Sequence, residues 1–107
     1  MKIFMDNQTV MDALEQATES ARPAVEVYSS MFCPYCSMAL RLLDNKGIEY
    51  QLHKVDFALR KRAEMRQRSG RTSVPQIFIG DTHVGGCDEL YALEHAGQLD
   101  ALLDGHH

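Results

Sequence analysis

Several features that would indicate a membrane or secreted protein are missing from this sequence of 107 residues. It contains no run of about 20 apolar residues, the length that a membrane-spanning helix requires. Its first residues reach the acidic Asp6 too early for a secretory signal peptide. Three cysteines are an odd number, which does not suit a framework of paired disulfides, and a chain of this size folds without such bonds. We therefore expect a cytoplasmic protein whose cysteines are free for chemistry.

Positive charge is also scarce overall, although it is concentrated in one part of the chain. The net charge of −4 argues against general nucleic-acid binding. Seven of the eleven lysines and arginines nevertheless fall between positions 54 and 71: Lys54, Arg60, Lys61, Arg62, Arg66, Arg68 and Arg71. Such a run is either the solvated face of a helix or a means of steering an anionic ligand or partner toward a nearby site. The sequence leaves both interpretations open.

The sequence does contain a pair of cysteines three residues apart, in the segment Cys33-Pro34-Tyr35-Cys36. Pro34 suits the first position of a helix, because its fixed φ fits there and its missing N–H would be unpaired in any case. Cys33 would then lie at the positive end of the helix dipole, among free backbone N–H groups that favour a thiolate. An alternating strand pattern precedes the pair and a helical pattern follows it. This context predicts a redox-active pair of thiols.

The hydrophobic pattern along the rest of the chain predicts one α/β domain. Strands are expected at 25–29, 48–55, 76–79 and 82–84, helices at 34–46, 58–69 and 88–96, and a last turn at 99–103. The order β-α-β-α-β-β-α implies two parallel strands and a hairpin in a four-stranded mixed sheet. In the basic helix, the expected apolar contacts are Leu59, Ala63 and Met65.

The two ends of the chain differ from this domain, which we expect to cover residues 24–104. We expect residues 1–23 to be an N-terminal extension, predicted to be helical because Thr9 can cap a helix that Pro23 ends. The sequence leaves open whether it packs on the domain or is a partly mobile arm. Residues 105–107, Gly-His-His, have the composition of a purification-tag remnant.

Three segments of the chain resemble the glutaredoxins, a family with the thioredoxin-like fold. They are Cys33-Pro34-Tyr35-Cys36, Thr72-Ser73-Val74-Pro75 and Gly85-Gly86-Cys87-Asp88, in the order and at the spacing of that family. The similarity runs through residues 24–104 and is closest to the small dithiol glutaredoxins of bacteria. Thioredoxin is a poorer match, because it carries a tryptophan before a Cys-Gly-Pro-Cys site and this chain has no tryptophan.

The resemblance implies a glutathione-dependent thiol–disulfide oxidoreductase that acts on protein–glutathione mixed disulfides and on protein disulfides. Cys33 would be the nucleophile and Cys36 the resolving thiol. Glutathione would be the co-substrate, and no metal is expected. The residues that the resemblance assigns to glutathione binding are Tyr35, Arg62, Thr72, Val74, Pro75, Cys87 and Asp88. It also implies a monomer whose partners are glutathione and disulfide-containing proteins, with ribonucleotide reductase among the candidates.

Most of these residues have an alternative structural role. Pro75 could merely start an edge strand, instead of forming a cis-proline turn that exposes the Val74 backbone to an extended peptide. Asp88 could cap a helix, instead of meeting the glutathione amine beside a helix N-terminus. Cys87 is expected to be a small apolar filler and not a third redox centre. Tyr35 either flanks the glutathione sulfur or is a surface aromatic.

The resemblance leaves open which basic residue binds glutathione, and the chain differs from many family members at Ser30. Arg62 is the expected partner of the glycyl carboxylate of glutathione, and Arg66 or Arg71 could reach it instead. Ser30 stands where many dithiol glutaredoxins carry a lysine that helps to hold the thiolate. We therefore expect the helix N-terminus, or the arginines as well, to contribute more of that stabilisation here.

Two metal-binding alternatives also follow from the paired cysteines. Some glutaredoxins form dimers that hold an iron–sulfur cluster, but relatives of that kind usually carry Gly or Ser in place of Pro34. A structural zinc site needs four ligands as a rule, and the cysteine pair supplies only two. The histidines show no ligand spacing with the cysteines, so we expect them on the surface: His53, His83 and His95.

Overall fold

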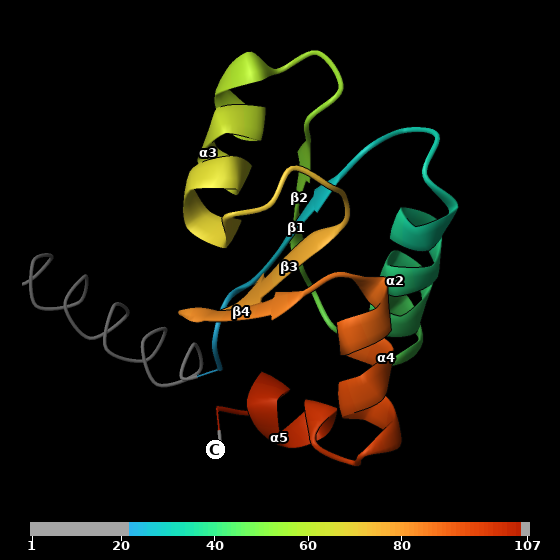
Figure 1. Cartoon of the computed structure of the whole chain (residues 1–107). Coiled ribbons are helices and arrows are strands. Elements are labelled where there is room, and N and C mark those ends of the chain that lie inside the picture. Colours follow the sequence, from blue (N-terminus) through green and yellow to red (C-terminus); the bar gives the residue numbers. More distant parts are fainter. Residues whose placement is uncertain (1–21, 106–107) are drawn as a thin grey trace, which may run out of the picture.

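The computed structural model describes residues 22–105, which form a four-stranded sheet with helices on both faces (Figure 1). The elements in chain order are β1 (Val25–Ser29), α2 (Pro34–Asn45), β2 (Gln51–Lys54), α3 (Leu59–Ser69), β3 (Gln76–Ile79), β4 (Thr82–Gly85), α4 (Cys87–His95) and α5 (Leu99–Leu103). The helical extension expected before Arg22 and the last two residues of the expected tag remnant lie outside the described residues. Among residues 22–105, no helix is both long enough and apolar enough to cross a membrane.

The sheet has the order β2-β1-β3-β4. Strands β1 and β2 are parallel, whereas β3 is antiparallel to both β1 and β4. This confirms the predicted mixed sheet with one parallel pair and one hairpin. The segments that follow β1 and β2 leave from the same end of the sheet, because the two strands run in the same direction.

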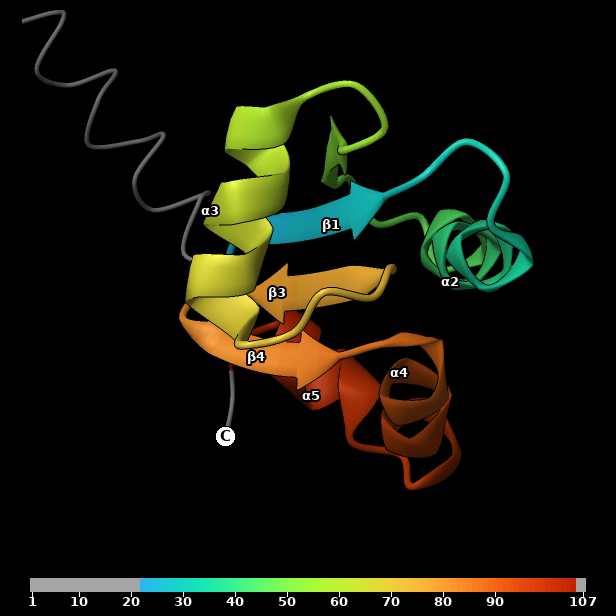
Figure 2. The ribbon, with the colours of Figure 1, turned by 45° about the horizontal axis from the view of Figure 1, so that its top comes forward.

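Apolar side chains bury both faces of the sheet, with α3 on one face and α2, α4 and α5 on the other (Figure 2). The larger cluster lies under α2, α4 and α5 and contains Val25, Val27, Ala39, Leu43, Ile77, Ile79, Cys87, Leu90, Leu99 and Leu103. The smaller cluster lies under α3 and contains Tyr28, Val55, Met65 and Phe78. Successive residues of β1 therefore point to different faces, as the alternation of a strand requires.

Helix α3 is held to the sheet by polar contacts as well as by Met65. Arg68 donates to both carboxylate oxygens of Glu26, at 3.1 and 3.2 Å, and to the Tyr28 hydroxyl at 2.7 Å. Nε2 of His53 lies 3.0 Å from the same carboxylate. The Tyr28 hydroxyl donates to Glu64. Burial, together with this hydrogen bond to a carboxylate, raises the pKa of Tyr28 to about 12.

Three expectations from the sequence are wrong in detail. The strand expected at 48–55 covers only Gln51–Lys54, because β1 offers partners to those four residues and the side chain of Ile48 packs on the larger core cluster. Leu59 is 84% exposed, because it occupies the first position of α3 and Met65 supplies the buried contact of that helix. Ala63 is exposed as well. The third concerns His53, which is buried because the alternation of β2 directs it toward Tyr28, with 4.7 Å between the ring centroids.

Candidate active site

Cys33 occupies the position immediately before α2, and Pro34 is the first residue of that helix, as the sequence predicts. The backbone of Cys33 is extended, with φ −127° and ψ 104°, and its side chain turns back over the helix end. The Cys36 N–H donates a hydrogen bond to the Cys33 sulfur at 3.2 Å. One of the free N–H groups at the start of the helix is therefore directed at the sulfur.

Cys36 lies one turn further along the helix and is only 2% exposed. Burial, followed by a hydrogen bond with Cys33, raises the pKa of Cys36 to about 11. Cys33 is half-buried and accessible. The two thiols are therefore unequal, with an accessible sulfur at the helix end and a protonated, buried one behind it.

The loop before β3 lies next to Cys33, although its residue Val74 is 41 positions further along the chain. The bond between Val74 and Pro75 is cis, which confirms the cis-proline turn that the resemblance implies. The Val74 carbonyl oxygen lies 3.8 Å from the Cys33 sulfur and accepts a weak hydrogen bond from the thiol. Backbone polar groups are thus next to the accessible sulfur, where an extended ligand can reach both.

A cavity of about 230 Å³ opens beside this loop. Its walls come from the start of α2, from the cis-proline loop and from the start of α4: Tyr35, Arg71, Ser73, Val74, Pro75, Gln76, Gly86, Cys87, Asp88 and Glu89. Five of the residues that the resemblance assigns to glutathione binding are in this set. Arg62 and Thr72 are not, and Ser73 and Arg71 line the wall in their place.

The start of α4 is arranged by Glu89 rather than by Asp88. Helix α4 begins at Cys87, and the Glu89 carboxylate accepts a hydrogen bond from the Gly86 N–H. Arg71 lies 3.4 Å from the same carboxylate. This backbone hydrogen bond and then the Arg71 charge hold the pKa of Glu89 below its usual value. Capping is therefore supplied by Glu89, and the exposed Asp88 lies at the cavity wall.

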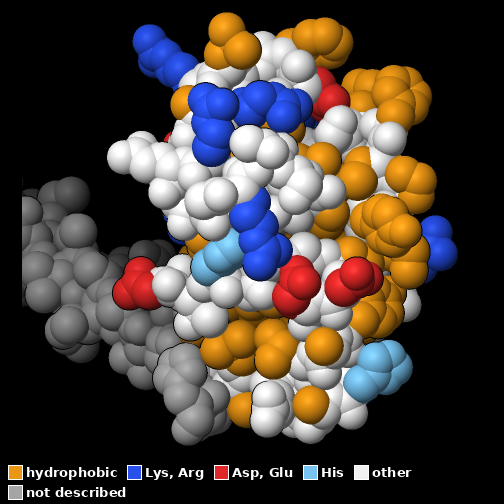
Figure 3. Space-filling view, viewed as in Figure 1, with side chains coloured by type: hydrophobic (Ala, Val, Ile, Leu, Met, Phe, Trp, Pro, Cys, Tyr) orange, Lys and Arg blue, Asp and Glu red, His pale blue; other side chains and the backbone are white. Residues whose placement is uncertain are grey.

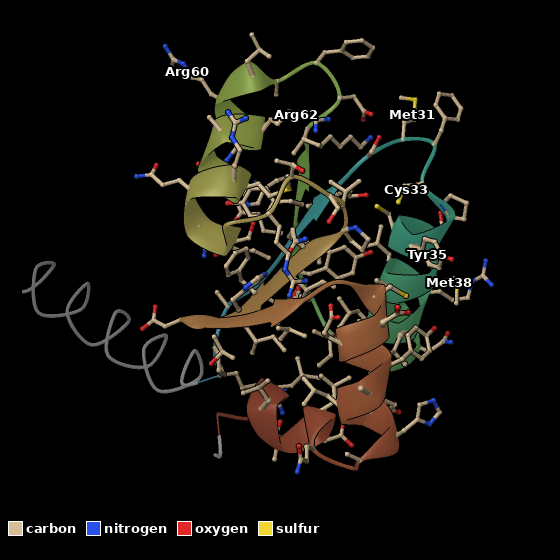
Figure 4. The ribbon with its side chains drawn as sticks, in the orientation of Figure 1. Met31, Cys33, Tyr35, Met38, Arg60 and Arg62 are labelled. Carbon is tan, nitrogen blue, oxygen red and sulfur yellow. The ribbon has the colours of Figure 1, made fainter. Side chains whose placement is uncertain are left out.

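The remaining predicted residues are Cys87, which is buried, and Tyr35, which is exposed. Cys87 is buried in the larger core cluster, and burial raises the pKa of its thiol, in keeping with an apolar filler. Tyr35 is 59% exposed at the start of α2, near Cys33 (Figure 4). The sequence reasoning missed Arg71 and Glu89 as a pair, since their 18-residue separation carries no periodic signal.

Two thiols of unequal burial at a helix start, in a thioredoxin-like sheet, are suited to thiol–disulfide exchange. The family model described as glutaredoxin matches residues 25–84. Among curated proteins, a glutaredoxin of Pseudomonas aeruginosa is 53% identical over 81 residues, which cover 76% of this chain and 96% of that protein. Glutaredoxin 3 of Escherichia coli is 54% identical over 79 residues, covering 74% of this chain and 95% of that protein.

Solved structures give the same result. The solution structure of a glutaredoxin from Brucella melitensis has a TM-score of 0.70 and 50% identity, covering 78% of this chain and 91% of that one. The crystal structure of a buckwheat glutaredoxin–glutathione complex has a TM-score of 0.69 and 31% identity, and the match covers 90% of this chain and 91% of that one. A third, from work on metal binding of glutaredoxins, has a TM-score of 0.61 and 49% identity, covering 78% and 91%. The chain belongs to the glutaredoxin family and is a thiol–disulfide oxidoreductase.

Proposed function

We propose that the protein is a cytoplasmic, monomeric oxidoreductase that uses glutathione to reduce protein–glutathione mixed disulfides and protein disulfides. The observation that carries this proposal is the cavity beside Cys33, whose walls combine the Val74 backbone with the start of α4. Exposed backbone groups pair with an extended peptide, and a helix N-terminus favours a carboxylate. Glutathione is a small peptide with two carboxylates and suits both walls. The buckwheat relative, solved in complex with glutathione, supports the same ligand.

The residues of the cavity have distinct roles in this proposal. The Val74 backbone, positioned by Pro75, pairs with the cysteinyl part of glutathione. The backbone N–H groups of Cys87 and Asp88 bind the γ-glutamyl carboxylate, and the Asp88 side chain meets the γ-glutamyl amine. Tyr35 flanks the sulfur of the bound ligand.

The partner of the glycyl carboxylate is a choice among three residues. Arg62 and Thr72 are the candidates that the family resemblance assigns. Arg71 joins them because it lines the cavity wall and has a guanidinium, a group that binds carboxylates well.

The reaction with a mixed disulfide needs only Cys33. Its thiolate attacks the glutathione sulfur, a new disulfide forms between Cys33 and glutathione, and the substrate sulfur leaves as a thiolate that takes a proton from water. The thiolate of a second glutathione then attacks the glutathione sulfur bound to Cys33. Oxidised glutathione leaves and the Cys33 thiolate is restored. In the net reaction, one glutathione thiol is oxidised and the substrate sulfur is reduced to a thiol, because the other sulfur of oxidised glutathione comes from the mixed disulfide.

A disulfide within a protein substrate also needs Cys36. After Cys33 has attacked one substrate sulfur, Cys36 loses its proton and attacks Cys33. The substrate leaves as a dithiol, and a disulfide between Cys33 and Cys36 remains, which two glutathione molecules reduce. Ribonucleotide reductase is a candidate substrate of this kind.

A glutathione-coupled assay on a small mixed disulfide, the one between glutathione and β-mercaptoethanol, tests the proposal. We expect turnover that depends on glutathione concentration. Absence of turnover with glutathione, together with activity when thioredoxin reductase supplies the electrons, would overturn it. Because a similar structure comes from work on metal binding of glutaredoxins, absorption spectra of freshly purified protein belong to the same test. A stable brown chromophore would favour the cluster-binding alternative.

A further inference from the structure

A group of large apolar side chains faces solvent at the Cys33 end of the molecule. Phe32 is 92% exposed, Phe57 98% and Leu59 84%, and Met31 is 61% exposed. Single exposed apolar residues are common, but a group of them marks an interaction site. These four belong to the segments that follow the parallel strands β1 and β2, so they lie at one end of the sheet. In Figure 3, apolar surface gathers above the start of α3 and along the β1–α2 side.

Asp56 joins these two segments. Its carboxylate accepts hydrogen bonds from the Ser30 hydroxyl and from the Met31 N–H, the latter at 3.0 and 3.2 Å from its two oxygens. These hydrogen bonds, that of Ser30 first, hold the pKa of Asp56 below its usual value, so the carboxylate is charged at neutral pH. Through its hydrogen bond to Asp56, Ser30 fixes the loop that carries Met31 and Phe32 to the loop that carries Phe57.

The charges beside this apolar group are mainly positive. Arg60, Lys61 and Arg62 occupy the first turns of α3, and Figure 4 shows Arg60 and Arg62 at the same end as Met31. Two acidic residues are also nearby. The oxygens of Asp56 bind the β1–α2 loop, and Glu64 accepts from Tyr28 and lies 3.5 Å from Lys61. A complementary partner therefore carries apolar side chains and negative charge.

We propose that Met31, Phe32, Phe57 and Leu59, with Arg60 and Lys61 at the border, form a docking surface for an acidic, apolar segment of a protein substrate. The bound segment would lie next to the disulfide that Cys33 attacks. This inference rests on the proposed function and names a class of protein substrate for it. None of the six residues lines the cavity assigned to glutathione, so the surface serves the protein part of a mixed disulfide.

A second copy of the chain fits this surface less well. In a two-fold dimer the same patch meets itself, which would bring Arg60 and Lys61 of both copies together. Like charges facing each other across an interface oppose binding. An acidic segment would instead be attracted to Arg60 and Lys61, and it would also lower the repulsion between these two residues.

The test uses three probes that carry glutathione in a disulfide. Two are short peptides with one glutathionylated cysteine flanked by phenylalanine and leucine, one with aspartates and the other with lysines in their place. The third is the small mixed disulfide with β-mercaptoethanol. For the wild-type protein, we expect kcat/KM about tenfold higher for the aspartate peptide than for the lysine peptide, and a smaller difference at high ionic strength.

Variants at exposed positions separate the apolar and charged contributions. Phe57→Ser combined with Leu59→Ser should lower kcat/KM for the aspartate peptide about tenfold, as loss of a central contact does, and leave the small disulfide unchanged. Phe57→Leu, which keeps an apolar side chain, should retain most of the activity. Arg60→Glu should remove the preference for aspartate. Arg22→Glu, the same charge change at the opposite end of β1, should not.

Equal kcat/KM values for the two peptides in the wild type would overturn the docking surface, as would an unchanged kcat/KM for the aspartate peptide in the Phe57 and Leu59 double variant. A dimer in sedimentation that Phe57→Ser dissociates would assign the surface to a second copy and would also overturn it. Failure to reduce the small disulfide would refute the proposed function instead. In that case, the Kd values of the two peptides with serine in place of the modified cysteine still test the surface, with the same expected preference.

Discussion

The backbone N–H of Cys36 donates a hydrogen bond to the sulfur of Cys33 at 3.2 Å, while the Cys36 thiol itself is buried beneath that sulfur. The same residue thus stabilises the nucleophile through its backbone and stays protonated through its side chain. This arrangement separates the two steps of thiol–disulfide exchange. The first attack belongs to Cys33, and Cys36 acts only after the mixed disulfide has formed.

Serine substitutions test this division of roles. Cys33→Ser should lose reduction of both mixed disulfides and protein disulfides, because the accessible thiolate is gone. Cys36→Ser should keep activity on a mixed disulfide, since its backbone N–H remains, and should lose reduction of disulfides within a protein. Steady-state rates on one substrate of each type measure both outcomes. Equal losses in the two variants would contradict the assignment.

The raised pKa of Cys36 predicts slow alkylation. At pH 8, a thiol with a pKa of about 11 has about two hundredfold less thiolate than a free cysteine. The greater nucleophilicity of the more basic thiolate offsets about tenfold of this. In Cys33→Ser, iodoacetamide should therefore modify Cys36 at least tenfold more slowly than free cysteine, and the rate should rise up to about pH 11.

Mass spectrometry of the alkylated protein separates Cys36 from Cys87, whose pKa is also raised by burial. The double variant Cys33→Ser with Cys87→Ala is the control, because it leaves Cys36 as the last thiol. A rate for Cys36 equal to that of free cysteine at pH 8 would show that burial does not protect it.

Much of this site could be predicted from local sequence. A proline after the first cysteine indicates a helix start, because its effect is on neighbouring residues. The cis-proline turn at Val74-Pro75 was expected from the family resemblance, since Pro75 taken alone could also start an edge strand. The pairing of Arg71 with Glu89 could not be predicted, because it depends on how the cis-proline loop meets α4. Ser73 was missed for the same reason, since only the turn decides whether it or Thr72 faces the cavity.

Gly85 is required by the close approach of Glu89. Its φ is +113°, and a Cβ at this position would lie 2.6 Å from Oε1 of Glu89. We expect Gly85→Ala to reduce the free energy of unfolding by about 2 kcal/mol and to displace Glu89 from the Gly86 N–H, which should also raise KM for glutathione. Urea unfolding and steady-state kinetics measure the two effects.

Gly70→Ala is the matched control for this change. Gly70 has a φ of +72°, and a Cβ there meets no atom within 4 Å. It should cost about 1 kcal/mol from the backbone alone and leave KM for glutathione unchanged. If both variants lose the same stability and keep the same KM, the contact with Glu89 is not important.

The elements of the fold could be predicted where the hydrophobic periodicity of the sequence is strong. They could be predicted less well where tertiary contacts set the length of a strand or the burial of a side chain. The order of strands and helices follows from alternating and helical patterns that each span several residues. The length of β2 depends instead on how many partners β1 offers it, which is a property of the sheet. His53 was expected on the surface because it has no ligand spacing with the cysteines. Its burial is possible because Glu26 and Tyr28 supply a hydrogen-bond partner and an aromatic contact.

Glu26 connects this buried histidine to α3 and makes stability depend on pH. Hydrogen bonds from Arg68 lower its pKa from the usual 4.5, against an opposing effect of burial, with His53 adding to the decrease. A carboxyl whose pKa is lower in the folded protein stabilises the fold above its unfolded pKa, and this contribution is lost as the pH falls through the folded value. Glu26→Gln should therefore cost about 1–3 kcal/mol at pH 7. The difference from wild type should stay constant down to about pH 5 and shrink below pH 4.5.

Chemical unfolding of both proteins at a series of pH values measures this dependence. Glu49→Gln, the same change at an exposed position, should alter stability by less than about 0.5 kcal/mol. Because α3 leads into the cis-proline loop, Glu26→Gln should also raise KM for glutathione slightly while leaving kcat unchanged. A stability difference that does not shrink as the pH falls below 4.5 would show that Glu26 acts through packing rather than through its charge.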